Sequence, residues 1–183
     1  MMVERIREEI AAGATYDDAM EKVRKNSIFT THTPVPAGHD VFTTQLIEQY
    51  FDSYWPLLGI SKDTFLDLGR HSGTGENSFN MTILSMKTSG HRNAVSRLHG
   101  KVTRRMWHGL WPDKTEEQVP ISYVTNGVHV PTWIALENRQ LYEKYLGKDW
   151  IYKHDDVALW EHINDIPDAE LWDLHQLLKR KLF

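Results

Sequence analysis

Residues 28–40 read Ile-Phe-Thr-Thr-His-Thr-Pro-Val-Pro-Ala-Gly-His-Asp and set the expected fold. The β-branched and aromatic residues at the start suit a short buried strand, whereas the prolines and the glycine that follow fit neither a strand nor a helix interior. The strand is therefore predicted to stop at His32 or Thr33. Because a turn and a helix follow, these polar residues are expected at the carboxyl edge of a sheet, where open α/β sheets bind ligands.

Helices are predicted on both sides of this strand. Apolar residues recur at helical spacing in residues 3–12, and four polar residues are expected to cap further helices at their N-termini. These predicted caps are Thr15, Asp40, Ser61 and Asn80. The alternation of helix, strand and helix indicates an α/β fold with many helices and short parallel strands.

A longer helix that carries Arg92 is predicted after a break near Gly90. Residues 121–124, Ile-Ser-Tyr-Val, then predict a second strand, which also ends in polar residues, Thr-Asn-Gly. If the two strands are neighbours in one parallel sheet, His32 and Asn126 meet at its carboxyl edge.

Composition excludes several classes of partner. The 183 residues carry a net charge of −4 and no cysteine, so neither nucleic acid nor a disulfide framework is expected. No apolar run approaches the roughly 20 residues that span a bilayer, and the N-terminus is too charged for a signal peptide, so we expect a cytoplasmic protein without a membrane partner. No two of the ten histidines stand three or four residues apart, so no metal site is predicted.

Three stretches, in this order, resemble the α-glucan phosphorylases, the glycogen, starch and maltodextrin phosphorylases, and are most similar to their short bacterial and archaeal branch. They are Phe29–Asp40, Asn80-Met81-Thr82 leading to Asn93–Gly100, and Val124–His129 leading to Pro131-Thr132-Trp133. The resemblance covers nearly the whole chain, yet the chain looks like an internal segment of such an enzyme. One departure is Ala94, where the family commonly has glycine.

The resemblance implies an architecture of two Rossmann-like domains, the GT-B type of glycosyltransferase. Residues 1–125 would then form the rear part of the N-terminal domain. Residues 126–183 would form the interdomain hinge and the first helices of the C-terminal domain, with the chain truncated at both ends relative to the family. Apolar surface exposed in this way would favour self-association.

The resemblance also implies a reaction. In the phosphorylases, inorganic phosphate cleaves the terminal α-1,4-glucosidic bond of a glucan and releases glucose 1-phosphate, with pyridoxal phosphate as cofactor. The Schiff-base lysine, the basic phosphate-binding residues and the glycine-rich loop have no counterparts here. We therefore expect this segment alone to bind no cofactor and to be inactive. Two alternatives remain open: a nucleotide-sugar glucan transferase of the same architecture, and a non-catalytic carbohydrate-binding remnant.

Four residues match functional positions of the family. On the residues alone, His32 is more often structural and Asn126 more often a turn residue. In the phosphorylases the histidine matching His32 lines the glucose subsite, with its backbone carbonyl facing the sugar, so His32 is the predicted catalytic residue. His32, Thr33 and Asn126 are the predicted substrate-binding residues, and Gly127 is the predicted hinge.

Overall fold

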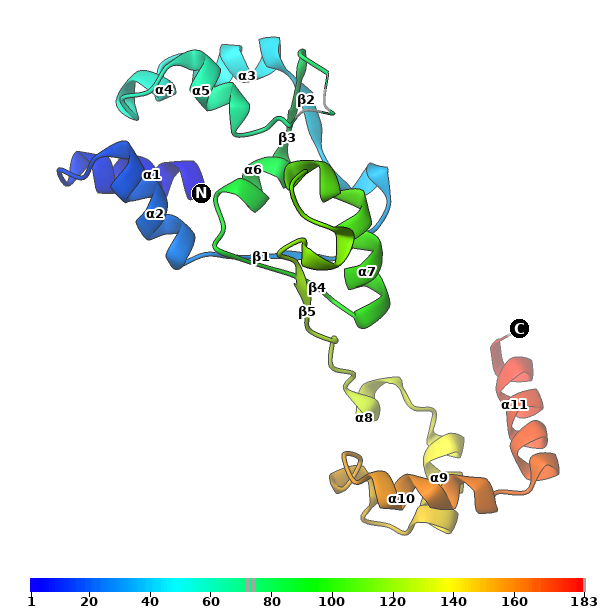
Figure 1. Ribbon diagram of the computed structural model, residues 1–183. Helices are drawn as coiled ribbons and strands as arrows, with labels where there is room; N and C mark the ends of the chain where they lie inside the picture. Colours follow the sequence, from blue (N-terminus) through cyan, green and yellow to red (C-terminus); the bar gives the residue numbers. More distant parts are fainter. Residues whose placement is uncertain (72, 74, 183) are drawn as a thin grey trace. The chain divides into compact units, whose positions relative to one another are not determined.

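The chain forms two compact units, Met1–Asn126 and Gly127–Phe183. The computed structural model, shown in Figure 1, describes residues 1–71, 73 and 75–182. Within these residues, no helix combines the length and the apolar character needed to cross a bilayer. The assignment of residues 1–125 and 126–183 to particular domains of a larger enzyme stays a prediction.

The first unit alternates helices with short strands. In chain order its elements are α1 (Met2–Ala11), α2 (Tyr16–Lys25), β1 (Ile28–Thr31), η1 (Pro36–Gly38), β2 (Val41–Thr43), α3 (Thr44–Phe51), α4 (Tyr54–Leu57), α5 (Lys62–Asp67), β3 (Ser78–Asn80), α6 (Met81–Lys87), β4 (His91–Ala94), α7 (Arg97–Met106), η2 (His108–Leu110), η3 (Glu116–Gln118) and β5 (Ser122–Tyr123).

Three of the strands form a parallel sheet in the order β1–β4–β5 (Figure 1). Thr31 of β1 lies opposite Ala94 of β4, and Ala94 lies opposite Tyr123 of β5. Helix α7 follows β4 and packs against β4 and β5. The predicted α/β class with short parallel strands is therefore confirmed. A separate antiparallel pair joins β2 to β3, with Phe42 opposite Phe79.

Strand β4 corrects the predicted helix around Arg92. Residues 91–94 are a strand between β1 and β5, so the two predicted strands share a sheet but are not neighbours. The side chain of Arg92 is buried, and its guanidinium donates to the carbonyls of Met86 and Ser89. A polar sequence is thus held as a strand by pairing on both sides and by a buried cation.

Three of the four predicted helix caps are confirmed. The side chains of Thr15, Ser61 and Asn80 each accept a hydrogen bond from a backbone N–H in the first turn of the following helix. The prediction for Asp40 is wrong, because residues 41–43 form β2 before the helix begins. Thr43 caps α3 instead, accepting from the backbone N–H of Leu46 at 3.3 Å.

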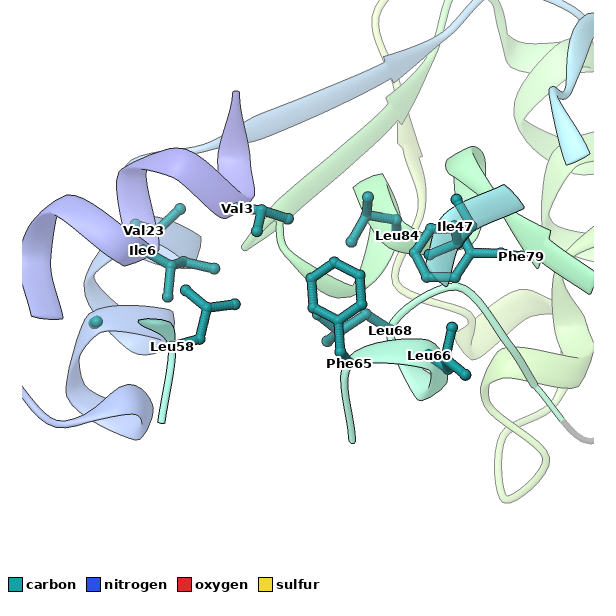
Figure 2. Close-up of a cluster of buried hydrophobic side chains, with 11 residues drawn as sticks. Val3, Ile6, Val23, Ile47, Leu58, Phe65, Leu66, Leu68, Phe79 and Leu84 are labelled. Atoms are coloured by element: carbon teal, nitrogen blue, oxygen red, sulfur yellow. The ribbon is translucent and has the colours of Figure 1, made fainter. Parts of the chain in front are cut away.

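The larger hydrophobic core of the first unit is centred on Phe65 (Figure 2). Its ring lies 5.5 Å from that of Phe51, 5.8 Å from Trp55 and 6.1 Å from Phe79, measured between centroids. Gly69 lets the chain pass the Phe79 ring, since a Cβ at this position would lie 2.5 Å from the ring carbons. The buried members of this core are Val3, Ile6, Ala19, Val23, Ile47, Leu58, Phe65, Leu66, Leu68, Phe79 and Leu84.

The second unit is helical in its described residues. Its elements are α8 (Val130–Trp133), α9 (Leu136–Leu146), η4 (Trp150–Tyr152), α10 (Val157–Glu161), η5 (His162–Asp165) and α11 (Asp168–Leu182). Fully buried Trp150 meets the rings of Tyr142 and Trp160 edge-on. Glu170 ties α11 to α9 by accepting from Lys144 and Tyr145, and these two contacts lower its pKa.

Glu4 on α1 generates a pH-dependent prediction. Its carboxylate accepts two hydrogen bonds from Arg7 and one from the hydroxyl of Tyr54, so it links α1 to α4. Arg7, and then Tyr54, lower the pKa of Glu4 from 4.5 to about 2. Because the folded-state pKa is depressed, this stabilisation is present above pH 4.5 and is lost as the pH falls towards 2.

We therefore expect Glu4→Gln to lower the melting temperature of the chain at pH 7. The difference in melting temperature between the variant and the wild type should become steadily smaller below pH 4.5. Thermal melts followed by circular dichroism between pH 7 and pH 3 measure it, with exposed Glu8→Gln as the matched control. A gap that stays constant across this range would contradict the prediction.

Candidate functional site

The carboxyl ends of the three parallel strands form one edge of the sheet in the first unit. His32 follows β1 directly, Val95 follows β4, and the chain after β5 continues beside β4. The backbone N–H of Val124 donates to the carbonyl of Ala94 at 2.9 Å, and that of Asn126 donates to the carbonyl of Val95 at 3.1 Å. Asn126 is therefore held at the same edge as His32.

His32 and Asn126 do not come into direct contact by this pairing, because β4 lies between β1 and β5. Two strand spacings separate them, which is roughly 10 Å. Both side chains are exposed, whereas Thr33 is half-buried. The edge thus presents two flanks, His32 with Thr33 on one side and Asn126 on the other.

A hollow of about 300 Å³ lies on the β1 side of this edge. It is lined by residues 29–33, by residues 38–40 and by three residues of α6, Met81, Thr82 and Ser85. Backbone groups in this lining, the exposed imidazole of His32 and the hydroxyl of Thr33 are able to hydrogen-bond sugar hydroxyls, whereas buried His39 and Thr82 bond to each other. The lining contains no lysine and no arginine, so these residues alone do not fit a cofactor that carries a phosphate group.

The turn after β1 closes tightly on Thr33. The Oγ1 atom of Thr33 accepts from the backbone N–H of Val35 at 3.3 Å, and the N–H of Gly38 donates to the carbonyl of Val35 at 3.0 Å. A Cβ on Gly38 would lie 2.0 Å from Thr33 Cγ2. Glycine is therefore required at residue 38 for the close approach to Thr33.

His39 was not predicted as a site residue, yet it lines the hollow. Its Nδ1 atom lies 2.8 Å from the Thr82 hydroxyl, and its ring meets that of Trp107 edge-on at 5.1 Å. Burial is the main cause that lowers the pKa of His39. Only its place at the end of the residue 28–40 stretch could have singled it out in the sequence.

Gly127 begins the second unit, and its role as a hinge stays a prediction. Its φ lies outside the left-handed region, and a Cβ there would meet nothing within 4 Å. The conformation therefore makes no use of the special freedom of glycine at this position. Among the residues that the structure describes, no group of three or more histidines or carboxylates is placed to hold a metal ion.

Comparison with known proteins finds close relatives, although no family model matches the chain. It is 42% identical to a maltodextrin phosphorylase from Thermococcus litoralis over 97% of the chain, and 44% identical to a glycogen phosphorylase from Aquifex aeolicus over 93%. It is 36% identical to a glycogen phosphorylase from Mycobacterium tuberculosis over 98%. The matched segment covers 21%, 24% and 21% of these three relatives, so the chain spans about a fifth to a quarter of their length.

The tight turn generates a prediction about Gly38. We expect Gly38→Ala to lower the free energy of unfolding by about 1–3 kcal/mol, because the new Cβ overlaps Thr33 Cγ2. Introducing Gly38→Ala together with Thr33→Ser should recover most of this loss, since serine lacks Cγ2 and keeps the hydroxyl.

Urea unfolding of the chain measures both effects. Gly127→Ala serves as the control, because its Cβ would meet no atom and a change within about 0.5 kcal/mol is expected. If Gly38→Ala costs as much in the Thr33→Ser background as in the wild type, the overlap with Thr33 is not its cause.

Proposed function

We propose that the chain, which is homologous over nearly its whole length to a segment of the maltodextrin and glycogen phosphorylases, belongs to an α-glucan phosphorylase of the short bacterial and archaeal type. In this proposal inorganic phosphate cleaves the terminal α-1,4-glucosidic bond of a glucan and releases glucose 1-phosphate. The parent enzyme would be a cytoplasmic glycosyltransferase with two Rossmann-like domains, the GT-B type.

One observation carries this proposal: 42–44% identity to phosphorylases over 93–97% of the chain. The relatives described above are named for phosphorolysis of two different glucans, which supports the reaction more strongly than any single glucan. The nucleotide-sugar transferase and the carbohydrate-binding remnant are not favoured by these relatives.

The carboxyl edge of the sheet supplies the residues for the sugar. We assign the backbone carbonyl of His32 to face the sugar at the bond that breaks, where an oxygen stabilises developing positive charge. The Thr33 hydroxyl and the Asn126 amide would hydrogen-bond sugar hydroxyls from the two flanks. The backbone N–H of Asn126 donates to the carbonyl of Val95, which holds the backbone of Asn126 at this edge and leaves its side-chain amide free for a ligand.

The cofactor of the parent would be pyridoxal phosphate, whose phosphate group supplies an acid–base partner for the substrate phosphate when it is bound. The residues that line the hollow beside His32 do not fit that group, because none of them is a lysine or an arginine. The chain's own contribution is therefore to bind and orient the glucan, and we expect no phosphorolysis from these 183 residues alone.

The complete product of the gene that carries this chain tests the proposal. We expect it to release glucose 1-phosphate from maltodextrin in the presence of inorganic phosphate. Incorporation of glucose from a nucleotide sugar, without phosphorolysis, would instead establish the transferase alternative. Saturable glucan binding with neither activity would establish the binding remnant.

Asn126→Ala in that product is expected to lower kcat/KM for maltodextrin by about 10- to 100-fold, the effect of losing a hydrogen bond to the sugar. Stability should change by less than about 0.5 kcal/mol, because the side chain is exposed and makes no hydrogen bond to another described residue.

Two further variants sharpen this prediction. Asn126→Asp keeps the shape of the side chain but loses the amide donor, so its kcat/KM should be lowered as much as that of the alanine variant. Exposed Asn77→Ala is the matched control and should behave as the wild type. Unchanged kinetics in both variants at residue 126 would remove Asn126 from the sugar site.

A further inference from the structure

Four buried side chains behind the candidate site have polar atoms with no hydrogen-bond partner in the described part of the chain. The atoms are His39 Nε2, His99 Nε2, Thr103 Oγ1 and Trp107 Nε1, and we call these four residues the His39 cluster. Each of the four is at most 9% exposed. His99, Thr103 and Trp107 recur at intervals of four along α7 and its C-terminal cap, so they share one face of that helix.

His39 connects this helix face to two other elements. Its Nδ1 atom lies 2.8 Å from the hydroxyl of Thr82 in the first turn of α6, and its ring meets Trp107 edge-on. The backbone N–H of Thr82 donates to Asn80 Oδ1 at 2.8 Å, so the partner of His39 is itself fixed by the cap of α6. The imidazole is therefore held by both α6 and α7.

The anchored imidazole stands next to the turn that carries the candidate site. His39 follows Gly38 directly, and Gly38 packs so closely on Thr33 that a Cβ would overlap the threonine methyl. The nearby Thr33 backbone partly offsets the lowering of the His39 pKa by burial. A displacement of the His39 side chain would therefore also displace the backbone of Thr33 and His32.

We propose that His39 is a positioning residue for the His32–Thr33 backbone, and that ordered water completes the hydrogen bonds of the His39 cluster. This inference rests on the proposed function in one respect only, namely that the His32–Thr33 backbone acts on a sugar. The positioning itself is a property of this chain.

The hydrogen-bond roles within the cluster fit ordered water. His99 Nδ1 accepts from the backbone N–H of Val95 at 3.4 Å, so a neutral ring carries its proton on Nε2. His99 Nε2 and Trp107 Nε1 are then donors that a water oxygen accepts. Water is likewise able to donate to His39 Nε2, which leaves the Nδ1 proton of His39 for Thr82.

The Thr82 hydroxyl gives the cleanest test, because Thr82→Val removes it at nearly constant shape while Thr82→Ser keeps it. In the complete gene product we expect Thr82→Val to lower kcat for maltodextrin phosphorolysis by about 10- to 100-fold with little change in KM, the effect of misplacing a reacting group. Thr82→Ser and exposed His175→Asn should stay within about twofold of the wild type. His39→Phe, which keeps a ring against Trp107, should lower kcat as much as Thr82→Val does.

Amide hydrogen exchange in this chain provides a readout that does not depend on activity. The Gly38 N–H, which donates to Val35, should exchange at least about tenfold faster in Thr82→Val than in Thr82→Ser. Equal exchange together with a wild-type kcat in Thr82→Val overturns the positioning role. If His39→Phe does not fold, the two Thr82 variants decide alone. If the wild-type product shows no phosphorolysis, the proposed function fails, and the exchange rates still decide the positioning role.

Discussion

The structure of the first unit depends on one polar strand, β4, held in the middle of a parallel sheet. Its backbone pairs with β1 on one side and β5 on the other, so it fixes the distance between the two ends of the candidate site. Gly90 allows the start of β4 to approach the last turn of α2 closely. Its N–H donates to the carbonyl of Arg24 at 2.8 Å, and a Cβ at this position would lie 2.5 Å from that oxygen. Helix α7 then starts where β4 ends, at the edge between His32 and Asn126.

Two cations in this unit, buried Arg92 and half-buried Lys87, stabilise helix ends. Arg92 donates to the carbonyl of Met86 in the last turn of α6 and to that of Ser89 just after it. Lys87 donates to the carbonyl of Asp67, the last residue of α5, at 2.5 Å and to that of Arg70, beyond α5, at 2.6 Å. Burial lowers the pKa of both side chains, while the partial negative charge of the helix C-termini favours a cation there. The hydrogen bonds of these two cations therefore go to backbone groups, and neither residue lines the hollow beside His32.

The sequence predicts what depends on neighbouring residues and misses what depends on distant ones. Thr15, Ser61 and Asn80 were identified as caps because a cap needs only the next three residues. Strand β4 was mistaken for helix, since its residues are polar and its strand character comes from pairing with segments about 30 and 60 residues away. Asp40 failed as a cap for the same reason, because β2 exists only through its pairing with β3. The two ends of the site were expected on one edge, but the strand between them was not visible in the sequence.

The residues that follow β4 form the floor between the two flanks of the candidate site. The carbonyl of Val95 accepts from Asn126, and its N–H donates to His99. The Ser96 hydroxyl accepts from the N–H of His99, so these groups of the floor already take part in hydrogen bonds within the first unit. His99 therefore takes part in this floor through Nδ1 and belongs to the His39 cluster, where its Nε2 atom is buried.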